Sequence, residues 1–185
     1  WISVEAGGTL VAVGQPDRPI LFDSNARTEV RGLWNGISFA NDARPTSKLY
    51  HVVIEEAGGD NDAPAAIHTY DDFVLDVAHV RIVRAKRHGV RLGGSSRFAA
   101  TATDLVVSAS GIAEDLSVPV YFTQANSVGS LPDGRYDGNV TNEIVVEGAE
   151  VGATATWRNP GVGVRYRLLD GLDVGGPTGA ILKIA

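Results

Sequence analysis

Residues 51–54 read HVVI and residues 79–82 read HVRI, so one short apolar motif recurs after 28 positions (79 − 51). The motif belongs to a series with three members, Val52–Ile54, Val80–Ile82 and Leu105–Val107, at spacings of 28 and 25 residues. A recurring spacing of this size is typical of a chain that stacks one structural unit on the next.

A second series interleaves with the first and runs through Leu10, Ile37, Ile67, Val90 and Ile112. No stretch keeps a 3.6-residue helical period across the intervening glycines. The alternation in HVVI predicts a short strand with Val52 and Ile54 inward and His51 and Val53 outward. One turn of a parallel β-helix takes roughly 20–30 residues and stacks on the next at about 4.8 Å, so the repeat predicts an all-β solenoid of this kind.

Composition and charge narrow the classes of function. The net charge is −6 and the basic residues are scattered, apart from a modest group between Arg81 and Arg91, so nucleic acid is not an expected partner. No run approaches the roughly 18–20 apolar residues of a transmembrane helix. The absence of cysteine excludes disulfides and thiol chemistry. The chain also lacks methionine, so we expect a processed product or a piece of a longer parent chain.

Three segments carry a resemblance to a known family: GTLVAVGQPDRPILFDS (8–24), GLWNGISFA (32–40) and SKLYHVVIEEAGG (47–59). Together they resemble the right-handed parallel β-helix repeats of bacterial cell-surface and secreted proteins, over residues 2–122. The resemblance implies a right-handed solenoid and a secreted, extracellular or cell-surface location. It implies little about activity, because such segments occur mostly in large surface proteins without a characterised function.

The rest of the chain suggests a second segment of the same kind. NEIVVEG (142–148) and ATWRNPGVGVRYRLLDGLDVGG (155–176) resemble the start of a fresh β-helix. Residues 123–141, TQANSVGSLPDGRYDGNVT, are polar and rich in Gly, Asn and Asp, which favours an extended linker. We therefore expect coils over 1–122, a linker over 123–141 and a further β-rich segment over 142–185.

The two ends of the chain resemble each other. ISVEAGGTLVAV (2–13) matches LDVGGPTGAILKIA (172–185) at offsets of 170 and 171 residues. An end of a β-helix without a cap exposes unpaired backbone groups and apolar side chains. Either the coils continue in a longer parent chain, or copies of this chain stack head to tail. The expected interface residues are Trp1, Ile2, Val4, Leu10, Leu172, Val174, Ile181 and Ile184.

Two groups of residues are candidates for binding metal. His51, His79 and Asp104 would form a column in adjacent coils and have suitable ligand chemistry, although outward residues of a solenoid line up for geometric reasons alone. The turn Asp60–Asn61–Asp62, with Asp71, Asp72 and Asp76 nearby, suggests calcium, but it lacks the spacing of an EF-hand and also reads as a solvated loop.

The sequence favours a structural protein without a cofactor over an enzyme. No nucleophile motif or acid–base spacing is present. The expected partners are other copies of this chain or the flanking coils of a longer parent chain. We expect the chain to assemble into a filament or to form part of a surface stalk. The alternative is a β-helix that binds or cleaves polysaccharide with a charged outer face formed by Glu55, Glu56, Arg81 and Arg84. An adhesin that binds a protein partner is equally compatible with the sequence.

Overall fold

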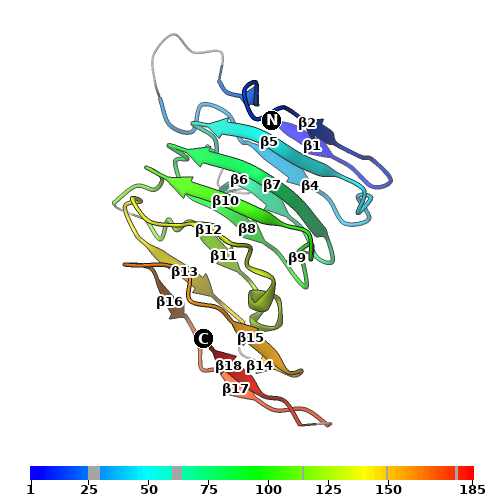
Figure 1. The fold of residues 1–185 in the computed structure, drawn as a ribbon, viewed down its shortest axis with the longest axis vertical. Helices are drawn as coiled ribbons and strands as arrows, with labels where there is room; N and C mark the ends of the chain where they lie inside the picture. The colour runs from blue at the N-terminus through cyan, green and yellow to red at the C-terminus, as the bar shows by residue number, and fades with distance from the viewer. Residues whose placement is uncertain (25–29, 60–63, 114, 149, 178) are drawn as a thin grey trace.

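The structure is a computed structural model that describes residues 1–24, 30–59, 64–113, 115–148, 150–177 and 179–185. The protein is all-β, as expected: its regular structure is short strands joined by turns, with one 3₁₀-helix, η1 (Ala125–Ser130), among the described residues. The strands are stacked along the long axis of the molecule, with β1 and β2 near one end and β17 and β18 near the other (Figure 1).

Most strands belong to two parallel sheets. Sheet A consists, in spatial order, of β1 (Ile2–Val4), β4 (Ile37–Phe39), β6 (Ala65–Thr69), β8 (His88–Leu92), β11 (Val120–Phe122), β13 (Glu143–Val146) and β16 (Arg165–Leu168). Sheet B consists of β12 (Gly134–Arg135), β10 (Thr103–Ser108), β7 (Val74–Val83), β5 (Lys48–Glu55) and β2 (Val11–Val13), with β3 (Ile20–Phe22) paired to β5 and β9 (Arg97–Phe98) paired to β7.

Two further parallel pairs lie at the C-terminal end of the stack. They are β14 (Glu150–Val151) with β17 (Asp173–Val174), and β15 (Ala155–Trp157) with β18 (Leu182–Ile184). Parallel strands need long connections. From β4 to β13 the chain makes these connections by passing repeatedly between sheet A and sheet B.

The strand registers test both predicted series. Val52 pairs with Val80 and Val80 with Leu105, so the first series is confirmed. In the second series Ile37, Ile67 and Val90 are partners, but Val90 then pairs with Val120 instead of Ile112. The prediction of Ile112 was wrong because the connection from β10 to β11 (residues 109–119) is longer than the connection from β7 to β8 (residues 84–87). Leu10 is also misplaced, since Ile2 is the partner of Ile37.

Each long strand of sheet B contains one residue in the left-handed region. These residues are His51 (φ 50°), His79 (φ 54°) and Asp104 (φ 49°), and the ladder pairs on either side of them skip this position. A second left-handed residue follows five positions later in each case, at Glu56, Arg84 and Ala109. Asp and His tolerate this conformation better than branched residues do. The repeated bend lets β2 and β3 pair with the two halves of β5.

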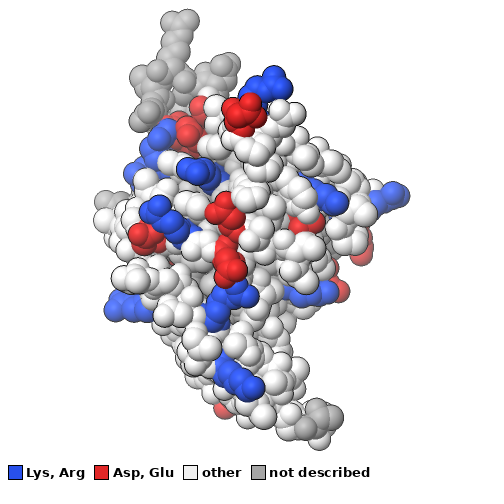
Figure 2. Space-filling model, in the orientation of Figure 1, with Lys and Arg blue, Asp and Glu red and all other residues white. Residues whose placement is uncertain are grey.

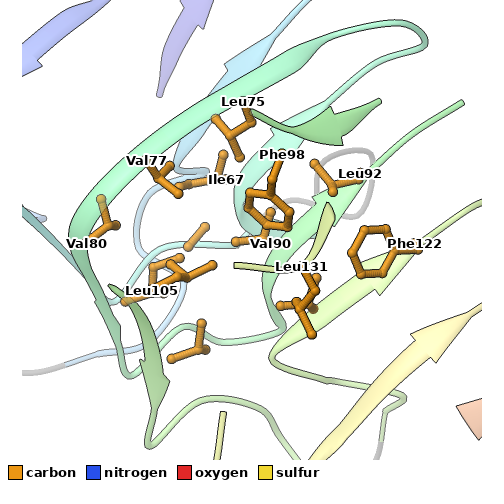
Figure 3. Packing of buried hydrophobic residues seen from close by; sticks show 14 of the residues in the cluster. Ile67, Leu75, Val77, Val80, Val90, Leu92, Phe98, Leu105, Phe122 and Leu131 are labelled. Atoms are coloured by element: carbon orange, nitrogen blue, oxygen red, sulfur yellow. The ribbon is translucent and has the colours of Figure 1, made fainter. Parts of the chain in front are cut away.

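The core lies between the sheets and consists of inward residues from both (Figure 3). Val52, Ile54, Val80, Ile82 and Leu105 have no exposed surface, which confirms the predicted inward positions. Aromatic residues from neighbouring segments also meet there, as in the stacked rings of Phe39 and Phe73, whose centroids are 4.6 Å apart. Burial of apolar area on this scale is the main stabilising contribution to the fold.

The expected linker at 123–141 is part of this same core. Ala125, Val128, Leu131 and Tyr136 are almost completely buried in the main cluster, and β12 pairs with β10. Sheet A also continues across this segment, since β11 is adjacent to β13. The polar composition was misleading because the glycines and asparagines form turns, while four spaced apolar residues point inward.

Candidate functional site

The C-terminal end of the stack exposes the last residue of three inward columns. Val146 is buried but its partner Leu168 is 42% exposed, and Val151 is buried but its partner Val174 is 44% exposed. The third column ends in the same way. Trp157 is buried and its partner Ile184 is 71% exposed. Apolar side chains aligned with the core are therefore uncovered at this end.

The N-terminal end of the stack contains a pocket. This pocket has a volume of about 600 Å³ and is lined by Trp1, Ile2, Leu21, Phe22, Asp23, Ser24, Leu33 and Trp34. Trp1, Leu21 and Leu33 are each at least half exposed. The pocket thus offers an apolar surface beside the free edges of β1 and β3.

The residues predicted for an assembly interface have different exposures. Trp1, Val174, Ile181 and Ile184 are exposed, whereas Ile2, Leu10 and Leu172 are half-buried against the core and Val4 is buried. Ile2 and Val4 lie in sheet A, but Val174 lies in β17 of a separate two-stranded sheet, and Leu172 directly precedes that strand. Leu168 and the aromatic residues Phe22 and Trp34 were missed, because the repeat of the terminal sequences did not include them.

The bends in sheet B produce a second candidate site, a groove on its outer surface. This outer groove has a volume of about 540 Å³ and is lined by Pro16, Pro19, His51, Val53, His79, Arg81 and Asp104. His51, His79 and Asp104 occupy equivalent bends of adjacent strands, so their side chains project next to one another. The predicted column of these three residues is therefore present in the structure.

The contacts within the column are specific. The rings of His51 and His79 stack with centroids 4.5 Å apart and an angle of 12° between their planes. Nδ1 of His79 lies 2.7 Å from Oδ2 of Asp104, and both side chains are about half exposed. Stacked rings do not direct their nitrogens at one point. Within the described ranges, no group of three or more His, Cys, Asp or Glu side chains is arranged to hold a metal ion.

The charged residues near the groove differ in the ion pairs that they form. Arg84 forms ion pairs with Glu55 (Nη2–Oε2, 2.9 Å) and Glu56 (Nε–Oε1, 3.4 Å). The predicted acidic–basic face is thus mostly an internal network of ion pairs. Arg81, which lines the groove, has no ion pair or hydrogen bond among the residues that the structure describes. Over the face shown in Figure 2, acidic and basic residues are interspersed.

The candidate calcium site falls partly outside the described residues, because Asp60, Asn61 and Asp62 are among those not described. The three nearby aspartates are each engaged with a protein partner. Asp71 accepts a hydrogen bond from Asn41, and Asp72 forms an ion pair with Arg97. Asp76 accepts hydrogen bonds from the hydroxyl groups of Tyr50 and Thr101.

Sequence reasoning missed a buried polar cluster on sheet A, formed by His68, His88, Arg91 and Tyr121. Nε2 of His68 lies 2.9 Å from Nη1 of Arg91, and Nδ1 of His88 accepts a hydrogen bond from the backbone N–H of Val118 at 3.2 Å. Burial, followed by the charge of Arg91, lowers the pKa of each histidine to about 4. The Arg91 guanidinium also lies over the Tyr121 ring.

Comparisons with protein families, curated proteins and solved structures found no match to this chain. Within the described part of the chain, no helix has the length and apolar character needed to cross a bilayer. The two ends of the stack and the outer groove are the candidate functional surfaces.

Proposed function

We propose that this chain is a structural segment of a right-handed parallel β-helix, and that copies of it stack head to tail through the two ends. One observation carries the proposal: the inward columns end in the exposed residues Leu168, Val174 and Ile184. Solenoids normally cover such an end with a further unit or a cap. A second copy would bury these side chains and continue each column.

The other end supports this pairing. The apolar pocket at Trp1, Leu21 and Trp34 can receive protruding apolar side chains from the opposite end of the next copy. The free edges of β1 and β16 also belong to one parallel sheet, so stacking in a single direction keeps every strand parallel. Such a contact joins two different surfaces and builds an open filament unless the rotation between copies closes a ring.

The proposal makes a dimensional prediction. Sheet A contributes seven strands per chain, and strands stack about 4.8 Å apart, so the filament should have an axial repeat of roughly 34 Å. The proposed secreted or cell-surface location is supported by the resemblance of residues 2–122 to bacterial surface repeats, and it can be tested by fractionation of the source cells.

The experiment is a concentration series of the purified chain, followed by sedimentation velocity and negative-stain microscopy. We expect filaments above a critical concentration. Ile184→Asp places a charge at the end of the Trp157 column and should raise that concentration at least about tenfold. Val162→Asp is the matched control, because Val162 is 98% exposed in the turn between β15 and β16 and belongs to no strand. Monomers at every concentration, or equal effects of both variants, would refute head-to-tail stacking.

A further inference from the structure

The outer groove of this acidic protein contains a cationic side chain, that of Arg81. Arg81 follows His79 by two residues on β7 and lies between Val53 and Val106 of the neighbouring strands. It has no ion pair or hydrogen bond within the described ranges, although the net charge of the protein is −6. A guanidinium in this situation is available for a bidentate contact with an anionic group, and carboxylate geometry suits it well.

The histidines add further hydrogen-bonding groups beside this charge. Nδ1 of His79 lies 2.7 Å from Oδ2 of Asp104, and a carboxylate can only accept a hydrogen bond, so Nδ1 carries the proton. Nε2 is therefore the polar atom of the His79 ring that remains for a ligand. The His51 imidazole stacks on His79 and makes no hydrogen bond to the described residues. Imidazole nitrogens at these positions can pair with hydroxyl groups, which both donate and accept.

The shape of the groove favours an extended ligand. His51, His79 and Asp104 lie on three successive strands, so the column is about 10 Å long at a spacing of 4.8 Å. Pro16 and Pro19 form part of the wall and add rigid apolar surface. A ligand with repeated hydroxyl groups and a carboxylate would use the full length of this surface.

Two other polymers fit less well. A peptide that adds a strand needs a free sheet edge, whereas β5, β7 and β10 are paired on both sides. Nucleic acid binding needs several cations to neutralise phosphates, whereas the described residues that line the groove include one arginine and no lysine.

We infer that the outer groove binds an acidic oligosaccharide, with a uronate carboxylate on Arg81 and sugar hydroxyls on His51 and His79. The groove shares no lining residue with the pocket at the N-terminal end, and Ile184 lies at the other end of the stack, so the two proposals can be tested separately. The binding surface is present on every copy, and a filament of this chain would repeat it along its length.

The test is isothermal titration of the purified chain with trimers of galacturonic, glucuronic, mannuronic and guluronic acid, each beside its carboxyl-reduced neutral counterpart. At least one acidic trimer should bind at least about tenfold more tightly than its neutral counterpart, because a charge-assisted bidentate contact is lost on reduction. Inorganic phosphate is included as a separate probe. Absence of binding to all four acidic trimers at millimolar concentration overturns the proposal.

Variants assign the binding to the groove. Arg81→Gln should weaken it at least about tenfold, and Asp104→Ala should weaken it because His79 loses the acceptor that fixes its proton. Arg97→Gln is the matched control, since Arg97 is an exposed arginine paired with Asp72. Equal losses for Arg81→Gln and Arg97→Gln, or tighter binding of phosphate than of any trimer, contradict the assignment. Ile184→Asp should leave binding unchanged, so failure of the stacking proposal and failure of this one are distinguishable.

Discussion

Lowering the pH from 7.5 to 5 should destabilise the fold through His68 and His88, which are buried in their neutral forms. Each has a ring nitrogen that accepts a hydrogen bond, from Arg91 and from the Val118 backbone respectively. Protonation would turn that acceptor into a donor facing another donor. It would also place a positive charge close to Arg91, which contributes to the lowered pKa of both rings.

The direction and size of this change in stability follow from the linkage between proton binding and folding. The pKa of each ring is about 4 in the fold and about 6.5 in the unfolded chain, so the unfolded chain binds more protons between these values. Stability is therefore full above about pH 6.5 and falls as the pH is lowered towards 4. At pH 5 each histidine costs about 2 kcal/mol, or about 4 kcal/mol together, against a typical total of about 5–15 kcal/mol.

The assay is urea unfolding followed by circular dichroism at several pH values between 7.5 and 5. His68→Gln and His88→Asn each retain an acceptor near the original nitrogen, and each should remove about half of the pH dependence, whatever its effect at pH 7.5. Keeping the pH at 5 or above avoids most carboxylate titration. A stability that is flat over this range, or a slope unchanged in both variants, would refute buried neutral histidines.

Three further predictions concern stability and are checked by thermal and urea unfolding. Asn139→Ala should cost about 2 kcal/mol, because the Asn139 side chain accepts from the Ser110 N–H and donates to the Val107 carbonyl, and its loss leaves these groups unpaired. Gly134→Ala should destabilise the protein by about 2 kcal/mol or more, since the new Cβ would lie 1.9 Å from the Leu105 carbonyl oxygen; wild-type stability would contradict this close approach. Glu143→Gln should destabilise the protein at pH 7, and this effect should disappear as the pH falls below about 4.5. Burial raises the pKa of Glu143, but the hydrogen bonds from Arg165 and Arg167 lower it by more, so the net shift of the pKa is downward. A constant difference from wild type across that range would count against the ion pairs.

The inward columns of the sheets could be predicted from the sequence because they depend on local periodicity. Val52, Val80 and Leu105 repeat at nearly constant spacing, and only parallel stacking places such residues on one another. The prediction failed where a connection changes length. Ile112 was selected by its spacing from Val90, while the true partner, Val120, follows a longer loop.

The outer groove was predicted only in part. The column of His51, His79 and Asp104 follows from the repeat, but the stacking of the imidazole rings and the Asp104 contact depend on side-chain directions at a left-handed bend. The proposed role of Arg81 also depends on its having no ion pair or hydrogen bond among the described residues, whereas Arg84, directly after β7, pairs with Glu55 and Glu56. No pattern in the sequence distinguishes the two arginines in this way.

By itself the sequence determined the strand columns and the all-β class, because alternation and spacing are properties of neighbouring residues. Only the tertiary structure decided which loops join the core, as at 123–141, and which polar residues are buried, as at His68 and His88. Burial and hydrogen-bond partners depend on segments distant in the chain, and their energies arise from desolvation and contacts that no local pattern contains.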